Sequence, residues 1–177
     1  EATSELREFA ELVQAPVMTT ILGKSAFPED HPLALGCGGA SASYGVREFL
    51  PRADLIFSIG ASLARTLASC SIPSGKTMIQ CVVDERDVNA EYALAAAVLG
   101  DAKLVLQQLC EEVRRQTGPE GRRDDARAAR EVAAMRARLQ EEWLPRLTSD
   151  ETPINPYRVI WDFMQTIDRA QAIVTHD

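Results

Sequence analysis

Three short apolar runs, each followed by a glycine or an aspartate, constrain the fold of this chain most strongly. They extend over residues 54–59, 77–83 and 96–99, and Gly60, Asp84 and Gly100 follow them. Strands that are apolar on both faces are typical of a parallel sheet with helices on both faces. The pattern therefore predicts an α/β domain whose strands end at a common edge.

The spacing of apolar residues and the position of breakers predict the remaining elements. These are helices over 6–13, 43–50, 104–113 and 122–144, and a further strand over 17–21 that runs into Gly23. A loop rich in proline and glycine follows that strand and ends near Gly36. Pro145 and the Thr148-Ser149-Asp150 cluster are expected to end the long polar helix, because proline lacks the N–H that a helix interior needs.

Charge and cysteine usage exclude several classes of function. The 19 Lys and Arg against 26 Asp and Glu give a net charge of −7, and no basic face dominates, which argues against nucleic acid as a partner. No apolar run is long enough to span a membrane. Four cysteines far apart, without a CxxC pair, indicate free thiols rather than a zinc site, and favour a cytoplasmic location.

The last 26 residues read as the beginning of another domain. Residues 153–167 have helical spacing, and residues 172–177 read as a buried strand ending in a polar tip. A strand of this kind normally continues into a loop and a helix. We therefore expect a piece of a larger protein with three parts: a Rossmann-like domain over 1–118, a connector helix and linker over 119–151, and the start of a further domain over 152–177.

The residues at the carboxyl ends of the strands are the candidate binding site. They are Gly23, Lys24, Gly60, Ala61, Ser62, Asp84, Asp101 and Ala102. Ligands of open α/β sheets bind outside these ends, where glycine permits close backbone approach and an acidic side chain can accept from a ribose hydroxyl. The sequence thus favours a nucleotide crevice. The alternative is that the same residues are ordinary turn and helix-cap residues.

A hydrolase is a remote alternative. Gly60-Ala61-Ser62-Leu63-Ala64 nearly matches the GxSxG turn that presents a nucleophilic serine between a strand and a helix, and Asp84 or Asp101 with His176 would complete a triad. Ala64 stands where the last glycine should be. A capping role for Ser62 is therefore the preferred interpretation.

Five segments, taken in order, resemble the thiamine-diphosphate-dependent enzymes, which include acetolactate synthase, benzoylformate decarboxylase and oxalyl-CoA decarboxylase. GKSAFPEDHPLALG (23–36) is similar to that family's GxGxFPxDHPLxLG, and ADLIFSIGASL (53–63) to its ADLxLxxGARx strand and turn. The stretch 78–88 and VLGDAKLVLQQL (98–109) are similar to the next two segments. INPYRVIWDFMQTI (154–167) and AIVTHD (172–177) resemble the opening helix and strand of the family's diphosphate-binding domain.

The resemblance implies a central domain, with a six-stranded parallel Rossmann-like sheet, followed by the start of the diphosphate-binding domain. Some members hold FAD or ADP in the central domain, and in others it is a scaffold. The candidate residues named above would meet the nucleotide. Ser62 stands where flavin-binding members have arginine, and Val82 stands where they have aspartate. These departures speak against FAD and leave ADP or no nucleotide.

The resemblance also implies the chemistry of the whole enzyme. Thiamine diphosphate and Mg²⁺ would support decarboxylase, lyase or synthase chemistry on a 2-keto acid or related carbonyl. The activating glutamate and the magnesium ligands of the family have no counterpart here, so neither catalytic nor metal-binding residues are expected and the chain alone should be inactive. His176 and Asp177 would lie near thiamine diphosphate.

The expected partners are the other domains of the same chain, in a homodimer or homotetramer. A different class of function stays open beside this one. The chain could be a free-standing nucleotide-binding module of Rossmann type, such as one with a sirtuin-like architecture, although the zinc cysteines of that architecture are missing.

Overall fold

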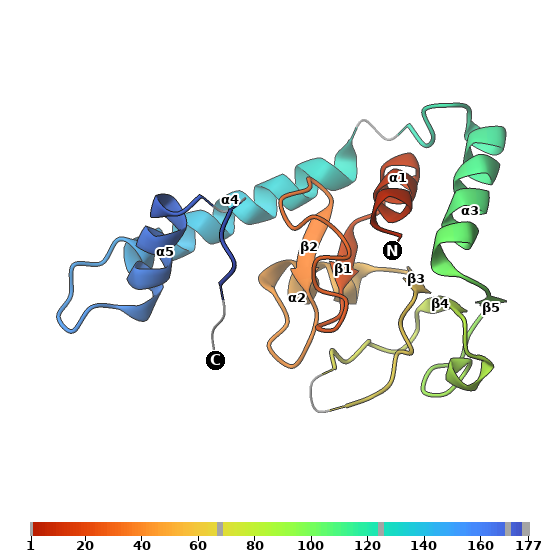
Figure 1. The fold of residues 1–177 in the computed structure, drawn as a ribbon, viewed down its shortest axis with the longest axis horizontal. Helices are drawn as coiled ribbons and strands as arrows, with labels where there is room; N and C mark the ends of the chain where they lie inside the picture. Colours follow the sequence, from red (N-terminus) through yellow and green to blue (C-terminus); the bar gives the residue numbers. More distant parts are fainter. Residues whose placement is uncertain (1, 67–68, 124–125, 169–170, 175–177) are drawn as a thin grey trace. The chain divides into compact units, whose positions relative to one another are not determined.

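The computed structural model describes residues 2–66, 69–123, 126–168 and 171–174 (Figure 1). The chain divides into two compact units, Glu1–Ala134 and Met135–Asp177. The first unit contains all the strands of the described residues, and the second contains most of one long helix and a further short helix.

Two small parallel sheets form the first unit. β1 (Val17–Thr19) pairs with β2 (Ala34–Cys37), whereas β3 (Leu55–Ile59), β4 (Thr77–Val82) and β5 (Ala96–Leu99) lie side by side in that order. The predicted parallel α/β arrangement is therefore confirmed. The predicted six-stranded sheet is wrong, because the described residues form one three-stranded and one two-stranded sheet.

The first two strands and the segment after β3 explain why the described residues do not form a six-stranded sheet. β1 has three residues, and its register with β2 shifts between Val17 and Met18, so this pair forms only a short ladder. Residues 61–66 and 69–76 form neither a helix nor a strand. β2 was not predicted, because it is four residues long and contains Gly36, which has a φ of +88°.

Two helices pack together beside the three-stranded sheet. α1 (Thr3–Val13) and α3 (Ala102–Thr117) lie next to each other (Figure 1), joined by an ion pair of 2.6 Å between Arg114 and Glu8. Phe9 of α1 meets Phe57 of β3 edge to face, with 5.8 Å between ring centroids. The remaining short helices of the unit are α2 (Tyr44–Phe49) and the 3₁₀ turns η1 (Leu50–Arg52) and η2 (Glu85–Asp87).

The loop between β1 and β2 contributes directly to the core. Phe27 and Leu33 are buried with Ala10 of α1 and Ala34 of β2. His31 fixes the loop, because its Nδ1 accepts from the Leu33 N–H at 3.1 Å and its Nε2 lies 3.0 Å from Glu11 Oε1. Part of the 23–36 segment is thus a core-forming loop.

The second unit is helical in its described residues. α4 (Arg127–Leu147) begins in the first unit and continues into the second, and α5 (Pro156–Thr166) follows. The helix continues through Pro145 to Leu147 and ends where the predicted Thr148-Ser149-Asp150 cluster begins, so the cluster and not Pro145 marks its end. Proline removes one N–H and is tolerated here near the helix end, where Thr148 N–H still donates to the Leu144 carbonyl at 3.0 Å.

Asn155 begins α5 as its N-cap, accepting from the Tyr157 N–H at 3.0 Å, with Pro156 in the first position. Tyr157 in turn meets Trp143 of α4 edge to face, at 4.8 Å between ring centroids. The predicted strand over 172–177 is not formed by Ala172–Val174, and residues 175–177 lie outside the described residues. No helix of the described residues combines the length and apolar character that a membrane crossing requires.

Candidate functional site

The three-stranded sheet brings the ends of its strands to one edge. The pairing of β3 with β4 continues past the strands through the Gly60 N–H, which donates to the Cys81 carbonyl at 2.9 Å. The Gly100 N–H likewise donates to the Val82 carbonyl at 3.0 Å. Because the strands are parallel and in register, Gly60, Asp84 and Asp101 follow three neighbouring strands at the same edge.

Gly60 turns the chain out of β3. Its φ is +66°, a region that glycine adopts without steric cost, and no atom lies within 4 Å of the position a Cβ would take. Ala61 and Ser62 then continue as an irregular loop. The Ser62 hydroxyl accepts from the Ala64 N–H at 3.4 Å.

This loop contradicts the sequence interpretation of Ser62. Residues 61–66, which follow Gly60, form no helix, so Ser62 is not a helix cap. The hydrolase alternative loses its structural context for the same reason, because its nucleophilic serine requires a sharp turn between a strand and a helix.

Asp84 is held by its neighbour Arg86. Its carboxylate accepts from the Arg86 backbone N–H at 3.0 Å and from the Arg86 Nε at 2.9 and 3.0 Å, and it also contacts Arg86 Nη2. These hydrogen bonds, from the side chain first and then the backbone, hold the pKa of Asp84 below its usual range. Asp84 is therefore an ionised acceptor at the strand edge.

Asp101 has a local structural role. Its Oδ1 accepts from the Leu104 N–H at 3.1 Å and so caps α3, in which Ala102 is the first residue. Burial, and then the negative charge of Asp101, raise the pKa of the Cys81 thiol. Asp101 is thus a helix-cap residue, as the alternative interpretation of the strand-end residues expects.

Gly23 and Lys24 follow the other sheet. They lie in the loop after β1, where the Gly23 N–H donates to Thr20 Oγ1 at 3.0 Å and Lys24 Nζ pairs with Glu29. The structure thus groups Gly60, Asp84 and Asp101 on adjacent strands of one sheet and places Gly23 and Lys24 at the end of a strand of the second. His176 and Asp177 lie outside the described residues.

Sequence reasoning missed Gln80 of β4, which is only 1% exposed. Its Nε2 donates to the Ala61 carbonyl at 3.1 Å and to the Ser62 carbonyl at 3.3 Å, so a buried amide fixes the loop after β3. The sequence does contain a signal for this role: Gln80 is a polar residue in the middle of the apolar run 77–83. A buried polar side chain needs hydrogen-bond partners, so its position there could have indicated a structural contact.

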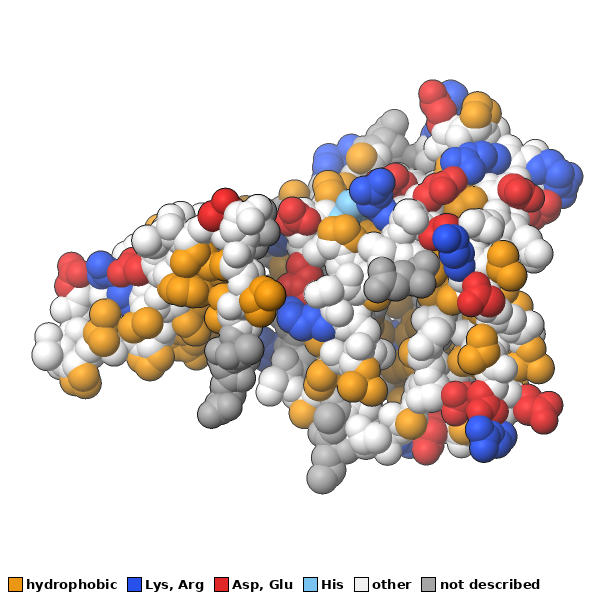
Figure 2. All heavy atoms as spheres, in the orientation of Figure 1, with side chains coloured by type: hydrophobic (Ala, Val, Ile, Leu, Met, Phe, Trp, Pro, Cys, Tyr) orange, Lys and Arg blue, Asp and Glu red, His pale blue; other side chains and the backbone are white. Residues whose placement is uncertain are grey.

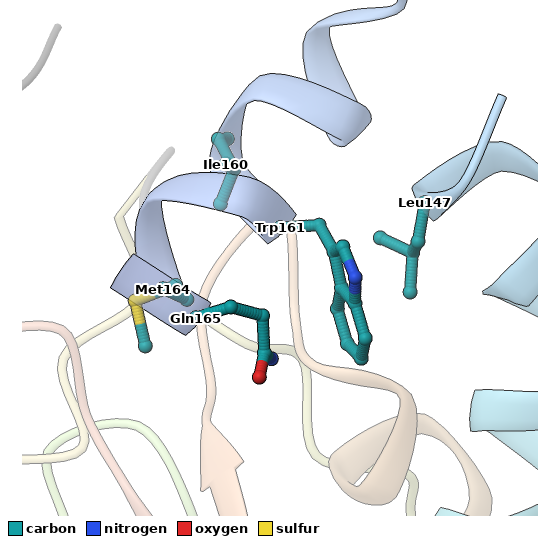
Figure 3. Close-up of a pocket in the computed structure, with 5 residues that line it drawn as sticks. All are labelled: Leu147, Ile160, Trp161, Met164 and Gln165. Atoms are coloured by element: carbon teal, nitrogen blue, oxygen red, sulfur yellow. The ribbon is translucent and has the colours of Figure 1, made fainter. Parts of the chain in front are cut away.

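A separate hollow lies in the second unit (Figure 3). Its volume is about 290 Å³, and it is lined by Leu147, Ile160, Trp161, Met164 and Gln165. None of the predicted site residues contributes to it. Figure 2 shows apolar side chains gathered on this unit, and the exposed ones on α5 include Tyr157, Val159, Ile160 and Phe163.

A metal site is not found in the described part of the chain, where no three His, Cys, Asp or Glu side chains come together. Mg²⁺ prefers oxygen ligands such as carboxylates.

Comparison with known proteins identifies one family. The family model described as "Thiamine pyrophosphate enzyme, central domain" matches residues 1–109. A probable acetolactate synthase large subunit of Methanocaldococcus jannaschii is 28% identical over 181 residues, covering 94% of this chain and 27% of the relative. A probable 2-ketoarginine decarboxylase of Pseudomonas aeruginosa is 31% identical over 145 residues, covering 81% of this chain and 25% of the relative.

Among solved structures, one described as a thiamin diphosphate-dependent enzyme from Mycobacterium smegmatis is similar with a TM-score of 0.50. It is 30% identical, and the similarity covers 62% of this chain and 22% of that one. The chain spans about a quarter of the length of the two curated relatives.

Proposed function

Because this chain belongs to the thiamine pyrophosphate enzymes, whose central domain it contains, we propose that it serves in an enzyme acting on a 2-keto acid or related carbonyl. The enzyme would be a decarboxylase, lyase or synthase that uses thiamine diphosphate and Mg²⁺. Thiamine diphosphate supplies a nucleophilic carbanion in such chemistry. We assign no residue of this chain to that step or to the metal.

The match of the central-domain family over residues 1–109 carries this proposal. The two relatives are a synthase and a decarboxylase by name, which supports the reaction class. The match also speaks against a free-standing nucleotide-binding module. The partners of this domain would be other domains of the same polypeptide, in a cytoplasmic homodimer or homotetramer.

The test uses the complete gene product that contains these 177 residues. With pyruvate and other 2-keto acids, we expect turnover that requires added thiamine diphosphate and Mg²⁺ and stops on chelation. Calorimetric titration of the 177-residue chain with the same cofactors should show no micromolar binding. Cofactor-independent turnover by the complete protein, or tight thiamine diphosphate binding by the chain, would contradict the proposal.

A nucleotide site at the edge of the three-stranded sheet is a second candidate. The grouping of Gly60, Asp84 and Asp101 after β3, β4 and β5 favours it, because parallel strand ends are where such ligands bind. Ser62 cannot supply the charge of an arginine, so the site should prefer ADP to FAD.

Thermal-shift titrations with ADP, FAD, NAD and coenzyme A test this site. ADP should stabilise the chain more than FAD does, and Asp84→Ala should weaken ADP binding. Tighter FAD binding, or ADP binding that is indifferent to Asp84→Ala, would show that the site is wrong. No binding of any of the four would leave the domain as a scaffold.

A further inference from the structure

The helix α5 presents an exposed apolar face within the second unit. Ile160, Phe163 and Met164 follow the i, i+3, i+4 spacing that places side chains on one side of a helix, and all three are exposed. Tyr157 and Val159 extend this face, because they lie three residues before Ile160 and four before Phe163. A helix normally packs such a stripe against another element, so the face indicates a contact surface.

The charged residues of α5 lie on its other side. They are Arg158 and Asp162, and Arg158 Nε lies 2.7 Å from Asp162 Oδ2, while Arg158 Nη1 lies 2.8 Å from Asp150 Oδ1. The helix therefore places no charge at the centre of its apolar face. This favours a second copy as the partner, because a symmetric pair brings the same patch of both copies together and would bring like charges together as well.

The hollow of the second unit continues from this face. Ile160 and Met164 belong to both, and Leu147, Trp161 and Gln165 form the rest of its lining (Figure 3). Its volume of about 290 Å³ is at the lower end of small-molecule pockets, so it suits one apolar side chain better than a ligand. A symmetric interface needs an exposed side chain and a place to receive it on the same patch, and α5 supplies Phe163 beside this hollow.

The exposed area is sufficient for a weak interface between two copies. A large apolar side chain presents on the order of 150–200 Å² when it is fully exposed, so six such residues that are 40–61% exposed offer roughly 500 Å². They are Ile154, Tyr157, Val159, Ile160, Phe163 and Met164. Two copies would bury roughly 1,000 Å² in total, which reaches the lower bound for a specific interface.

We propose that this face is the contact surface between two copies of the chain. The α5 helix of one copy packs against α5 of the other, and the Phe163 side chain of each copy occupies the hollow of the other. Because the area is small, the dissociation constant is on the order of 10–100 µM. This association depends neither on the enzyme reaction nor on the nucleotide site proposed above.

Sedimentation velocity of the 177-residue chain over about 2 to 200 µM tests the proposal, since this range brackets the expected dissociation constant. The wild type should shift from monomer to dimer across the range. Ile160→Lys should weaken the association at least tenfold, because the interface would then have to desolvate a charge. Leu104→Lys is the matched control and should change nothing, because Leu104 of α3 is 59% exposed, close to the 61% of Ile160, but lies in the first unit.

Phe163→Ala should weaken the association roughly tenfold, as truncation of an aromatic interface anchor does. Ile160→Glu should disrupt it as Ile160→Lys does, but an equimolar mixture of these two variants should associate again, since opposite charges then meet. A misfolded variant would not be rescued in this way, and circular dichroism checks the fold of each.

Three results would overturn the proposal. A wild type that stays monomeric at every concentration would show that a different partner covers the face. Association that is unchanged in Ile160→Lys, or weakened equally by Leu104→Lys, would place the contact elsewhere. A mixture of Ile160→Lys and Ile160→Glu that stays monomeric would refute the pairing of α5 with α5.

Discussion

Replacement of Phe27 tests whether the loop between β1 and β2 builds the core. Phe27 is 1% exposed and packs with Ala10, Leu33 and Ala34, with its ring edge-on to His31 at 4.8 Å between centroids. Truncation of a buried phenylalanine to alanine costs about 3–5 kcal/mol, through lost burial and the cavity left behind. We expect Phe27→Ala to destabilise the chain by this amount. Phe27→Leu keeps most of the apolar volume but loses the ring contact, and should cost about 1–2 kcal/mol.

Urea unfolding followed by far-ultraviolet circular dichroism measures both variants. In a chain of this size each kcal/mol corresponds to about 2–4 °C, so Phe27→Ala should also lower the melting temperature by roughly 6–20 °C. Leu22→Ala is the control, because Leu22 lies in the same loop but is fully exposed, and its change should stay within about 0.5 kcal/mol. A loss below about 1 kcal/mol for Phe27→Ala would refute the assignment of this loop to the core.

Three further predictions concern single positions. Hydrogen bonds from Arg115 and then Gln116 lower the pKa of Glu112 from 4.5 to about 2, so its contribution to stability is present above pH 4.5 and lost as the pH falls toward 2. Glu112→Gln should therefore lower the melting temperature more at neutral pH than at pH 2, and an equal change at both pH values would contradict the ion pair. At Gly121 (φ +73°) a Cβ would lie 2.3 Å from the Leu12 carbonyl oxygen, whereas at Gly118 (φ +93°) nothing lies within 4 Å. Gly121→Ala should consequently lower the melting temperature more than Gly118→Ala does, and equal effects would argue against the close approach. Ile173 and Val174 are exposed and outside any strand, so their amides should exchange fast with deuterium, and slow exchange in a monomer would show that they are held in a sheet.

The strands of the three-stranded sheet could be predicted from sequence because each is a continuous apolar run. β5 has the predicted bounds, and β3 and β4 differ from them by one residue. β2 could not be predicted in this way, because a four-residue strand that contains a glycine is too short to show an alternation of apolar and polar residues. Its place is decided by pairing with β1, which lies 15 residues or more earlier in the chain.

The candidate site also contains features that the sequence could predict and features that it could not. Sequence could name Gly60, Asp84 and Asp101, since strand ends of this type are recognisable as glycine or aspartate after an apolar run. It could not show that Asp84 is already bound by Arg86 and Asp101 by the Leu104 N–H, because the same residue types serve as caps and as ligand contacts. Gln80 was missed, since its contacts with Ala61 and Ser62, 19 and 18 positions earlier, depend on the register of neighbouring strands.

The sequence by itself determined the family and the parallel α/β class, because both follow from ordered local patterns along the chain. Only the tertiary structure decided how many strands pair, that the FPEDHPL loop supplies core residues, and that residues 61–66 after β3 form no helix. These outcomes depend on the burial of Phe27 and Leu33 and on the hydrogen bonds of Gln80. Burial and long-range hydrogen bonds form only when distant segments meet, so a local pattern cannot specify them.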